Sequence, residues 1–200
     1  MNKKIFFILF FLGLLINGFL LGSFLLNPVI SLDSGFYLSI AKEMYEGKIY
    51  FQEIGIAYNP LSIVTFGFPF LFDDSPNYRW HLILNLLVII GSSIIFYKIL
   101  NKIHFQKEKN ILFTLLFLFL TLTFDGKYLM LEPLSVFFQL LALLFYLNFR
   151  ESNNFKKIFF TGVFICLSFF SKQYGLFILL PIAIDILVFS KNKVKSILLL

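Results

Sequence analysis

Long hydrophobic runs alternate with short polar segments along this chain of 200 residues. A helix needs about 20 apolar residues to cross the hydrocarbon core of a bilayer. By that rule the sequence predicts six membrane-spanning helices, at residues 5–26, 79–100, 110–125, 131–149, 157–174 and 175–190. The first run is too long and too uniform for a signal peptide, so we interpret it as an uncleaved span.

The expected fold is therefore all-α: a polytopic transmembrane helix bundle. No internal repeat or low-complexity linker divides the sequence, so we expect residues 1–200 to form a single transmembrane domain. A seventh apolar segment begins at Ser196. We expect the chain to be the N-terminal fragment of a longer membrane protein.

The segment 27–78 is the only long connection between predicted spans. Long ordered loops are more often functional than short ones. Its first part has apolar residues at helical spacing, ending at Gly47, and predicts an amphipathic helix in the membrane interface. The apolar positions are Phe36, Tyr37, Ile40, Ala41 and Met44. Residues 61–72 are apolar but too short to span, so we expect a second interfacial or re-entrant segment.

Composition excludes a soluble globular domain. The chain is 59% hydrophobic, only 14% of its residues are charged, and its mean hydropathy is +0.88. A soluble fold of this size needs a more charged exterior. The single cysteine, Cys166, lies in an apolar run, where we expect a small core residue and no disulfide or metal framework.

The net charge of +6 is distributed as short basic clusters between spans, and this is not a nucleic-acid signature. With a cytoplasmic N-terminus, twelve basic residues face inside and five face outside, as the positive-inside rule requires. The inner group is Lys3, Lys4, Lys98, Lys102, Lys107, Lys109, Arg150, Lys156, Lys157, Lys191, Lys193 and Lys195. The outer group is Lys42, Lys48, Arg79, Lys127 and Lys172. We therefore expect a multi-pass protein of the cell membrane with its N-terminus in the cytoplasm.

Acidic residues show the opposite distribution. Eight of the eleven fall in the outer segments: Asp33, Glu43, Glu46, Glu53, Asp73, Asp74, Asp125 and Glu132. Because acids contribute little to orientation, this excess has two interpretations. Either the outer loops are simply longer, or the external face carries a site.

Four stretches in a fixed order narrow that choice. They are Asp33-Ser34-Gly35-Phe36-Tyr37; Tyr58-Asn59-Pro60-Leu61; Glu132-Pro133-Leu134-Ser135; and Gly162 followed by Leu167-Ser168-Phe169-Phe170-Ser171-Lys172-Gln173-Tyr174-Gly175 and Leu180-Pro181. Together they resemble the GT-C superfamily of polytopic membrane glycosyltransferases. The resemblance is strongest to the branch of dolichyl-phosphate-mannose protein mannosyltransferases and bacterial lipid A aminoarabinose transferases.

The resemblance implies a glycosyltransferase that moves a hexosyl or pentosyl group from a polyprenyl-phosphate donor. The acceptor would be a lipid, glycan or protein at the external membrane face. The expected partners are that donor, the acceptor and membrane lipids. No nucleotide-sugar motif of the Walker or Rossmann type occurs in the sequence, in keeping with a lipid-phosphate donor.

Asp33 is the catalytic candidate. The resemblance implies a general base at this place, which removes the proton of the acceptor hydroxyl as it attacks the anomeric carbon. By itself, Asp33 also suits a helix N-cap, and the two interpretations are compatible. Protein-glycosylating relatives usually have Asp-Glu here, whereas this chain has Asp33-Ser34.

Lys172 is the candidate for binding the donor phosphate, because a cation there would stabilise the negative charge of the leaving polyprenyl phosphate. A lysine that snorkels at a helix end is an equal alternative. Arg79 has the same two interpretations. The predicted substrate-binding residues are Tyr37, Asn59, Glu132 and Gln173. Glu132-Pro133 also suits the first turn of a helix.

No metal site is predicted, although a divalent cation as cofactor is left open. Asp73-Asp74 precedes Ser75-Pro76 and is typical of a turn. Asp185 lies inside a predicted span, where ionisable groups are costly, so we expect it to pair with a neighbouring helix or to lie near the inner surface. A deep polar residue is also typical of a transporter or lipid flippase, the first alternative function. A non-catalytic membrane subunit is the second.

Overall fold

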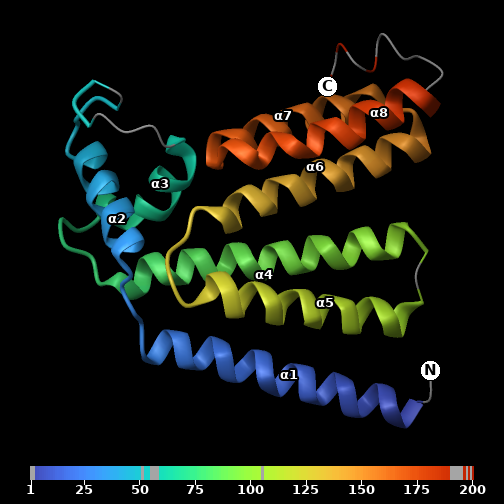
Figure 1. The fold of residues 1–200 in the computed structure, drawn as a ribbon, viewed down its shortest axis with the longest axis horizontal. Coiled ribbons are helices and arrows are strands. Elements are labelled where there is room, and N and C mark those ends of the chain that lie inside the picture. Colours follow the sequence, from blue (N-terminus) through green and yellow to red (C-terminus); the bar gives the residue numbers. More distant parts are fainter. Residues whose placement is uncertain are drawn as a thin grey trace.

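The chain folds into a bundle of long helices with two shorter helices at one end (Figure 1). The structure, a computed structural model, describes residues 3–50, 52–54, 59–104, 106–189, 196, 198 and 200. Every regular element in these ranges is helical, which confirms the all-α prediction. The elements are α1 (Lys3–Leu26), α2 (Leu32–Tyr45), α3 (Pro60–Gly67), η1 (Phe68–Leu71), α4 (Tyr78–Lys102), α5 (Lys107–Thr121), η2 (Leu122–Gly126), α6 (Glu132–Ser152), α7 (Phe155–Ser171), η3 (Gln173–Ile178) and α8 (Leu179–Phe189).

Successive long helices run in opposite directions, so their connections gather at two ends of the bundle (Figure 1). One end carries α2, α3, residues 127–131 and Lys172, and we call it the α2 end. The other end carries the start of α1 and the connections that follow α4 and α6. The predicted single domain over residues 1–200 stays a prediction.

Four of the predicted spans are long and apolar enough to cross a membrane: Lys3–Leu26, Tyr78–Lys102, Lys107–Gly126 and Glu132–Ser152. The other two are shorter. α7 has 17 residues, and η3 and α8 form one apolar helical segment at Gln173–Phe189. Because spanning helices range down to about 17 residues, both lie at the short limit. The sequence placed the break between them at residue 174, whereas α7 ends at Ser171.

α2 begins and ends for local reasons. Its N-cap is Ser31, whose side chain accepts a hydrogen bond from the Ser34 amide. The alternative interpretation of Asp33 as the helix cap is therefore wrong, and Asp33 lies instead in the first helical turn, where an acid is favourable. The helix ends two residues before Gly47, whose φ of 93° lies in the left-handed region that glycine tolerates.

The predicted apolar face of α2 is covered by protein. Tyr37, Ile40 and Ala41 are buried and form a cluster with Ile63 of α3 and with Leu131. Gly67, the last residue of α3, permits this approach, because a Cβ there would lie 2.5 Å from the Ala41 Cβ. The Tyr45 hydroxyl donates a hydrogen bond to the Val64 carbonyl (2.9 Å). α2 and α3 therefore form one packed unit. Its position in the membrane interface stays a prediction.

Helices α6 and α7 are joined by reciprocal hydrogen bonds. The Ser168 hydroxyl donates to the Ser135 carbonyl (2.9 Å), the Ser135 hydroxyl donates to the Ser168 carbonyl (3.2 Å), and the two hydroxyl oxygens lie 2.9 Å apart. Both side chains are fully buried. Small residues that let helices approach, with hydroxyls bonded across the contact, are typical of membrane helix packing.

Asp185 pairs with a neighbouring helix, the first of the two predicted arrangements. Its carboxylate accepts hydrogen bonds from the Arg150 guanidinium and the Tyr146 hydroxyl, both on α6. A charge inside a span is expensive unless it is paired, and this pair joins α8 to α6.

The prediction that Cys166 is a core residue is wrong, because its thiol is free and exposed on the surface of α7. An apolar run predicts a helix, but in a bilayer the apolar side can face lipid as well as the core.

We expect Gly67→Ala to destabilise the protein, because its added methyl would overlap Ala41. Overpacking of this kind costs about 1–3 kcal/mol. Gly18→Ala is the matched control, since a Cβ at Gly18 meets nothing within 4 Å. Thermal unfolding in detergent should show a lower midpoint for Gly67→Ala only. Equal midpoints for both variants would contradict the close α2–α3 contact.

Candidate active site

Lys172 and Glu132 form an ion pair at the α2 end. The Lys172 Nζ lies 3.0 Å from the Glu132 Oε1, and both side chains are largely buried, with 16% and 27% of their surface exposed. Glu132 opens α6, with Pro133 beside it in the first turn as the sequence predicted. Lys172 follows α7 in extended conformation (φ −156°, ψ 139°). Two of the predicted site residues, 40 positions apart in sequence, are thus brought together.

The position of Lys172 depends on a tight reversal of the chain. The Gly175 amide donates a hydrogen bond to the Lys172 carbonyl (2.9 Å), which starts η3 directly after α7. A Cβ on Gly175 would lie 2.3 Å from the Ser168 Oγ and 2.4 Å from the Ser168 carbonyl carbon. Only glycine permits η3 to fold back this closely on α7. The reversal aims the lysine at the start of α6.

Tyr174 adds a hydroxyl to this cluster. Its ring centroid lies 6.0 Å from the Lys172 Nζ, and its hydroxyl interacts electrostatically with Glu132, Asp125 and Tyr37. Tyr37 is a buried residue of α2, and its interaction with Tyr174 connects this predicted residue to the cluster. The sequence did not single out Tyr174, although its place two residues after Lys172 was a usable signal.

Asp125, one of the acids that the sequence places in the outer segments, lies close enough to Glu132 for their charges to interact. It belongs to η2, a turn of π-helix at the end of α5. Such turns are rare and often occur at functional sites. The side chain of Asn85 holds the turn, donating to the carbonyls of Asp125 and Tyr128 (3.0 Å each).

The Asn59-Pro60 corner meets the same site. The Asn59 amide donates a hydrogen bond to the Phe169 carbonyl in the last turn of α7. The buried Ser62 hydroxyl contacts the carbonyls of Leu131 (3.0 Å) and Ser171 (3.2 Å), the residues that precede Glu132 and Lys172. The predicted corner therefore supports the backbone on both sides of the ion pair. Tyr58, the first residue of that motif, lies outside the described residues.

Asp33 is exposed in the first turn of α2. It precedes Tyr37 by four positions, so both lie on one side of the helix. No described contact joins the Asp33 carboxylate to Lys172 or Glu132. Its neighbour Ser34 is fully buried and bonds both backbone groups of Leu129, accepting from the amide (3.1 Å) and donating to the carbonyl (3.2 Å). A glutamate at this fully buried position would place a charge in the interior, which is costly unless the charge is paired.

Arg79 and Gln173 are not part of the Lys172–Glu132 ion pair. The Arg79 guanidinium donates to the Leu26 carbonyl (3.3 Å) at the end of α1, and its described contacts do not include Glu132 or Lys172. Gln173 follows Lys172 directly and begins η3 with an exposed side chain. Arg79 thus joins α1 to α4, while Gln173 lies at the rim of the site.

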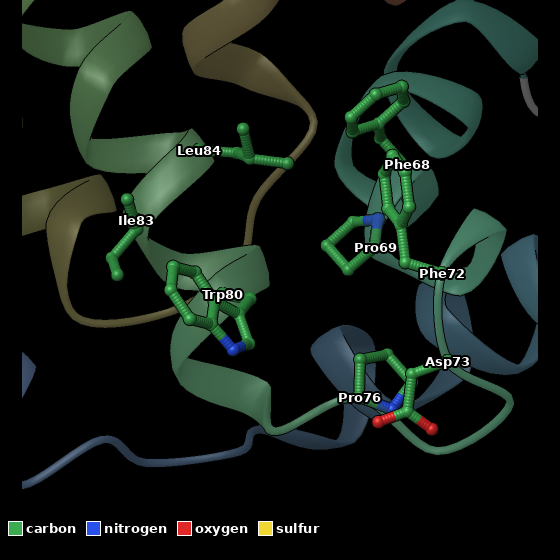
Figure 2. A pocket seen from close by; sticks show the side chains of 8 residues that line it. All are labelled: Phe68, Pro69, Phe72, Asp73, Pro76, Trp80, Ile83 and Leu84. Atoms are coloured by element: carbon green, nitrogen blue, oxygen red, sulfur yellow. The ribbon is translucent and has the colours of Figure 1, made fainter.

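A hollow of about 360 Å³ lies between η1 and the start of α4 (Figure 2). Aromatic, proline and aliphatic side chains line it, and its one carboxylate, Asp73, accepts a hydrogen bond from the Ser75 amide (2.9 Å). This confirms the predicted turn at Asp73. Because the hollow has no cation and its acid is used in the turn, we do not assign the chemistry to it.

No group of three His, Cys, Asp or Glu side chains able to hold a metal ion occurs in the part of the chain that the structure describes. The acids of the site, Asp125 and Glu132, are a pair only. Hard cations in proteins take about six or more oxygen ligands, so two carboxylates would need further oxygens from a substrate or from water. A divalent cation therefore stays open.

The candidate site lies within a region that matches a known protein family. The family model described as dolichyl-phosphate-mannose-protein mannosyltransferase matches residues 37–191. The match includes Tyr37, Asn59, Arg79, Glu132, Lys172 and Gln173 and begins four residues after Asp33. Neither a curated protein nor a solved structure matches the chain. Since the match covers more than half of its length, the chain belongs to the dolichyl-phosphate-mannose-protein mannosyltransferase family of membrane glycosyltransferases, which use polyprenyl-phosphate sugar donors.

Proposed function

We propose that this protein transfers a sugar from a polyprenyl phosphate to an acceptor hydroxyl at the α2 end, which faces the external side of the cell membrane. The observation that carries the proposal is the largely buried Lys172–Glu132 ion pair, held between α6 and α7 within the family match. A cation at this depth suits a lipid-linked phosphate, because attraction between charges is stronger where water is scarce.

The orientation is argued from charge. Basic residues concentrate at the end opposite α2, where Lys102, Arg150 and Lys157 lie near the ends of their helices. By the positive-inside rule, this distribution favours a cytoplasmic location for that end. Two of its basic residues, Lys102 and Arg150, form ion pairs with Glu151 and Asp185.

In the proposed reaction Asp33 accepts the proton of the acceptor hydroxyl. The acceptor oxygen then bonds to the anomeric carbon, the bond from that carbon to the phosphate oxygen breaks, and its electron pair stays on the phosphate. Lys172 stabilises the resulting charge on the polyprenyl phosphate. Attack from the side opposite the leaving group inverts the anomeric carbon.

The remaining predicted residues surround this chemistry. Tyr37, Asn59, Glu132 and Gln173 are proposed to shape the pocket for the sugar and the acceptor. Arg79 is proposed as a second cation for the donor phosphate, which requires it to leave the Leu26 carbonyl. The acceptor is a lipid, glycan or protein. The family description favours protein, and the buried Ser34 in place of the acid of protein-glycosylating relatives favours the other two.

We expect Asp33→Asn to lower the rate of sugar transfer about 10²- to 10⁴-fold, the usual contribution of a general base. The amide keeps the size of the side chain but cannot take the proton. Transfer from a labelled polyprenyl-phosphate mannose in membrane vesicles measures the effect. Asp74→Asn, which changes another exposed acid of the α2 end, is the control. Undiminished transfer at normal expression would refute the role of Asp33.

We expect Lys172→Ala to weaken donor binding about ten- to a hundredfold, because hydrogen bonds to charged groups contribute roughly 1.5–3 kcal/mol. Lys172→Arg should retain part of the affinity, since it keeps the charge. Binding of the labelled donor to purified protein in detergent measures the effect. Lys127→Ala, at an exposed lysine of the same end, should bind as the unaltered protein does. Equal affinity for Lys172→Ala and Lys127→Ala would show that the phosphate lies elsewhere.

A further inference from the structure

The second carboxylate oxygen of Glu132 has no hydrogen-bond partner. Oε1 faces the Lys172 Nζ at 3.0 Å, whereas Oε2 is buried and accepts no hydrogen bond. A buried polar atom without a partner costs roughly 1–3 kcal/mol, and more when it carries charge. Such atoms are rare in native proteins, and each one needs an explanation. The other buried oxygens of this kind in the described residues belong to neutral side-chain amides, so the Glu132 oxygen is the one that carries a charge.

The described groups around Glu132 leave Oε2 without a donor in hydrogen-bonding geometry. Lys172 is engaged on the other oxygen. Asp125 is an acid and repels Glu132 when both are ionised. The Tyr174 hydroxyl lies within hydrogen-bonding reach of the Glu132 carboxylate, but Oε2 has no partner of good hydrogen-bond geometry. Oε2 is thus a buried hydrogen-bond acceptor in a polar cluster, and it lacks a donor.

Glu132 is placed where a sugar would lie. Under the proposed function, on which this inference rests, Lys172 binds the donor phosphate and the transferred sugar is attached directly to that phosphate. A group that shares its carboxylate with Lys172 is therefore adjacent to the sugar ring. Carboxylates are strong acceptors for hydroxyl groups, because the hydrogen bond is charge-assisted.

We infer that the Glu132 Oε2 accepts a hydrogen bond from one hydroxyl of the sugar being transferred, and that this contact selects the sugar. A site built to bind a hydroxyl discriminates strongly against an analogue that lacks it, because the buried acceptor is then left unpaired. Glu132 is thereby a specificity-determining residue in addition to a partner of Lys172.

The test compares donors that differ by one hydroxyl. Transfer is measured from polyprenyl-phosphate mannose and from its monodeoxy analogues, with the unaltered protein and with Glu132→Gln, in membrane vesicles. The unaltered protein should disfavour one analogue about ten- to a hundredfold in kcat/KM, the effect of one charge-assisted hydrogen bond. Glu132→Gln should lose most of that discrimination while its selectivity at the other positions stays unchanged.

Two control variants separate this contact from a structural role. Glu43→Gln alters another ion-paired glutamate of the α2 end, 3.4 Å from Lys48, and should keep the full discrimination. Tyr174→Phe removes the tyrosine hydroxyl that interacts with Glu132 and should also keep the discrimination. If Glu132→Gln slows every donor equally, Glu132 acts only through Lys172 and the inference is wrong. If Glu132→Gln keeps the discrimination and both Glu132→Gln and Tyr174→Phe lower the unfolding temperature alike, Oε2 serves Tyr174 and the inference is also wrong.

Failure of the proposed function gives a different result. If the unaltered protein transfers no sugar from any donor and binds none, the glycosyltransferase proposal fails, and the inference fails with it. Transfer by the unaltered protein without selectivity against any monodeoxy analogue overturns the inference alone.

Discussion

A lipid environment leaves the backbone no water for hydrogen bonding, so each break in a helix must be satisfied by the protein itself. In this chain the side chains that do so gather at the α2 end. Ser34 bonds the backbone of Leu129, Ser62 bonds the carbonyls of Leu131 and Ser171, and Asn85 holds the π-helical turn. Small polar side chains therefore provide the hydrogen bonds that the backbone lacks where the helices are interrupted. The ion pair of Lys172 and Glu132 lies where two of these breaks meet, so its geometry follows from the same constraint.

The helices were predictable because their signal is strong and local. Runs of apolar residues define the long helices to within about three residues at each end, since lipid excludes every alternative to a helix there. The break between α7 and η3 was misplaced because it is set by contact and not by composition. Gly175 lies against Ser168, and that close approach draws the chain back three residues early.

The residues of the site were partly predictable. Lys172, Glu132, Asn59 and Tyr37 were candidates because they stand in motifs of the family. The contacts of Tyr174 and Asp125 could not be predicted, because they depend on which side chains face one another across α5, α6 and η3. Ser34 was interpreted as a departure from the family pattern, and only its burial reveals that it supports the loop before α6. The partners of Asp185 were likewise hidden, since Tyr146 and Arg150 belong to another helix.

The hydrogen-bonded serine pair between α6 and α7 prevents one helix from sliding along the other. Ser135 lies one helical turn after Glu132, and Ser168 lies one turn before Lys172. Each residue of slip would move the two charges about 1.5 Å along the helix axis. It would also leave the paired hydroxyls and carbonyls without their partners inside the bundle. Two serines that take no part in the proposed chemistry thus fix the distance between the charged groups of Lys172 and Glu132.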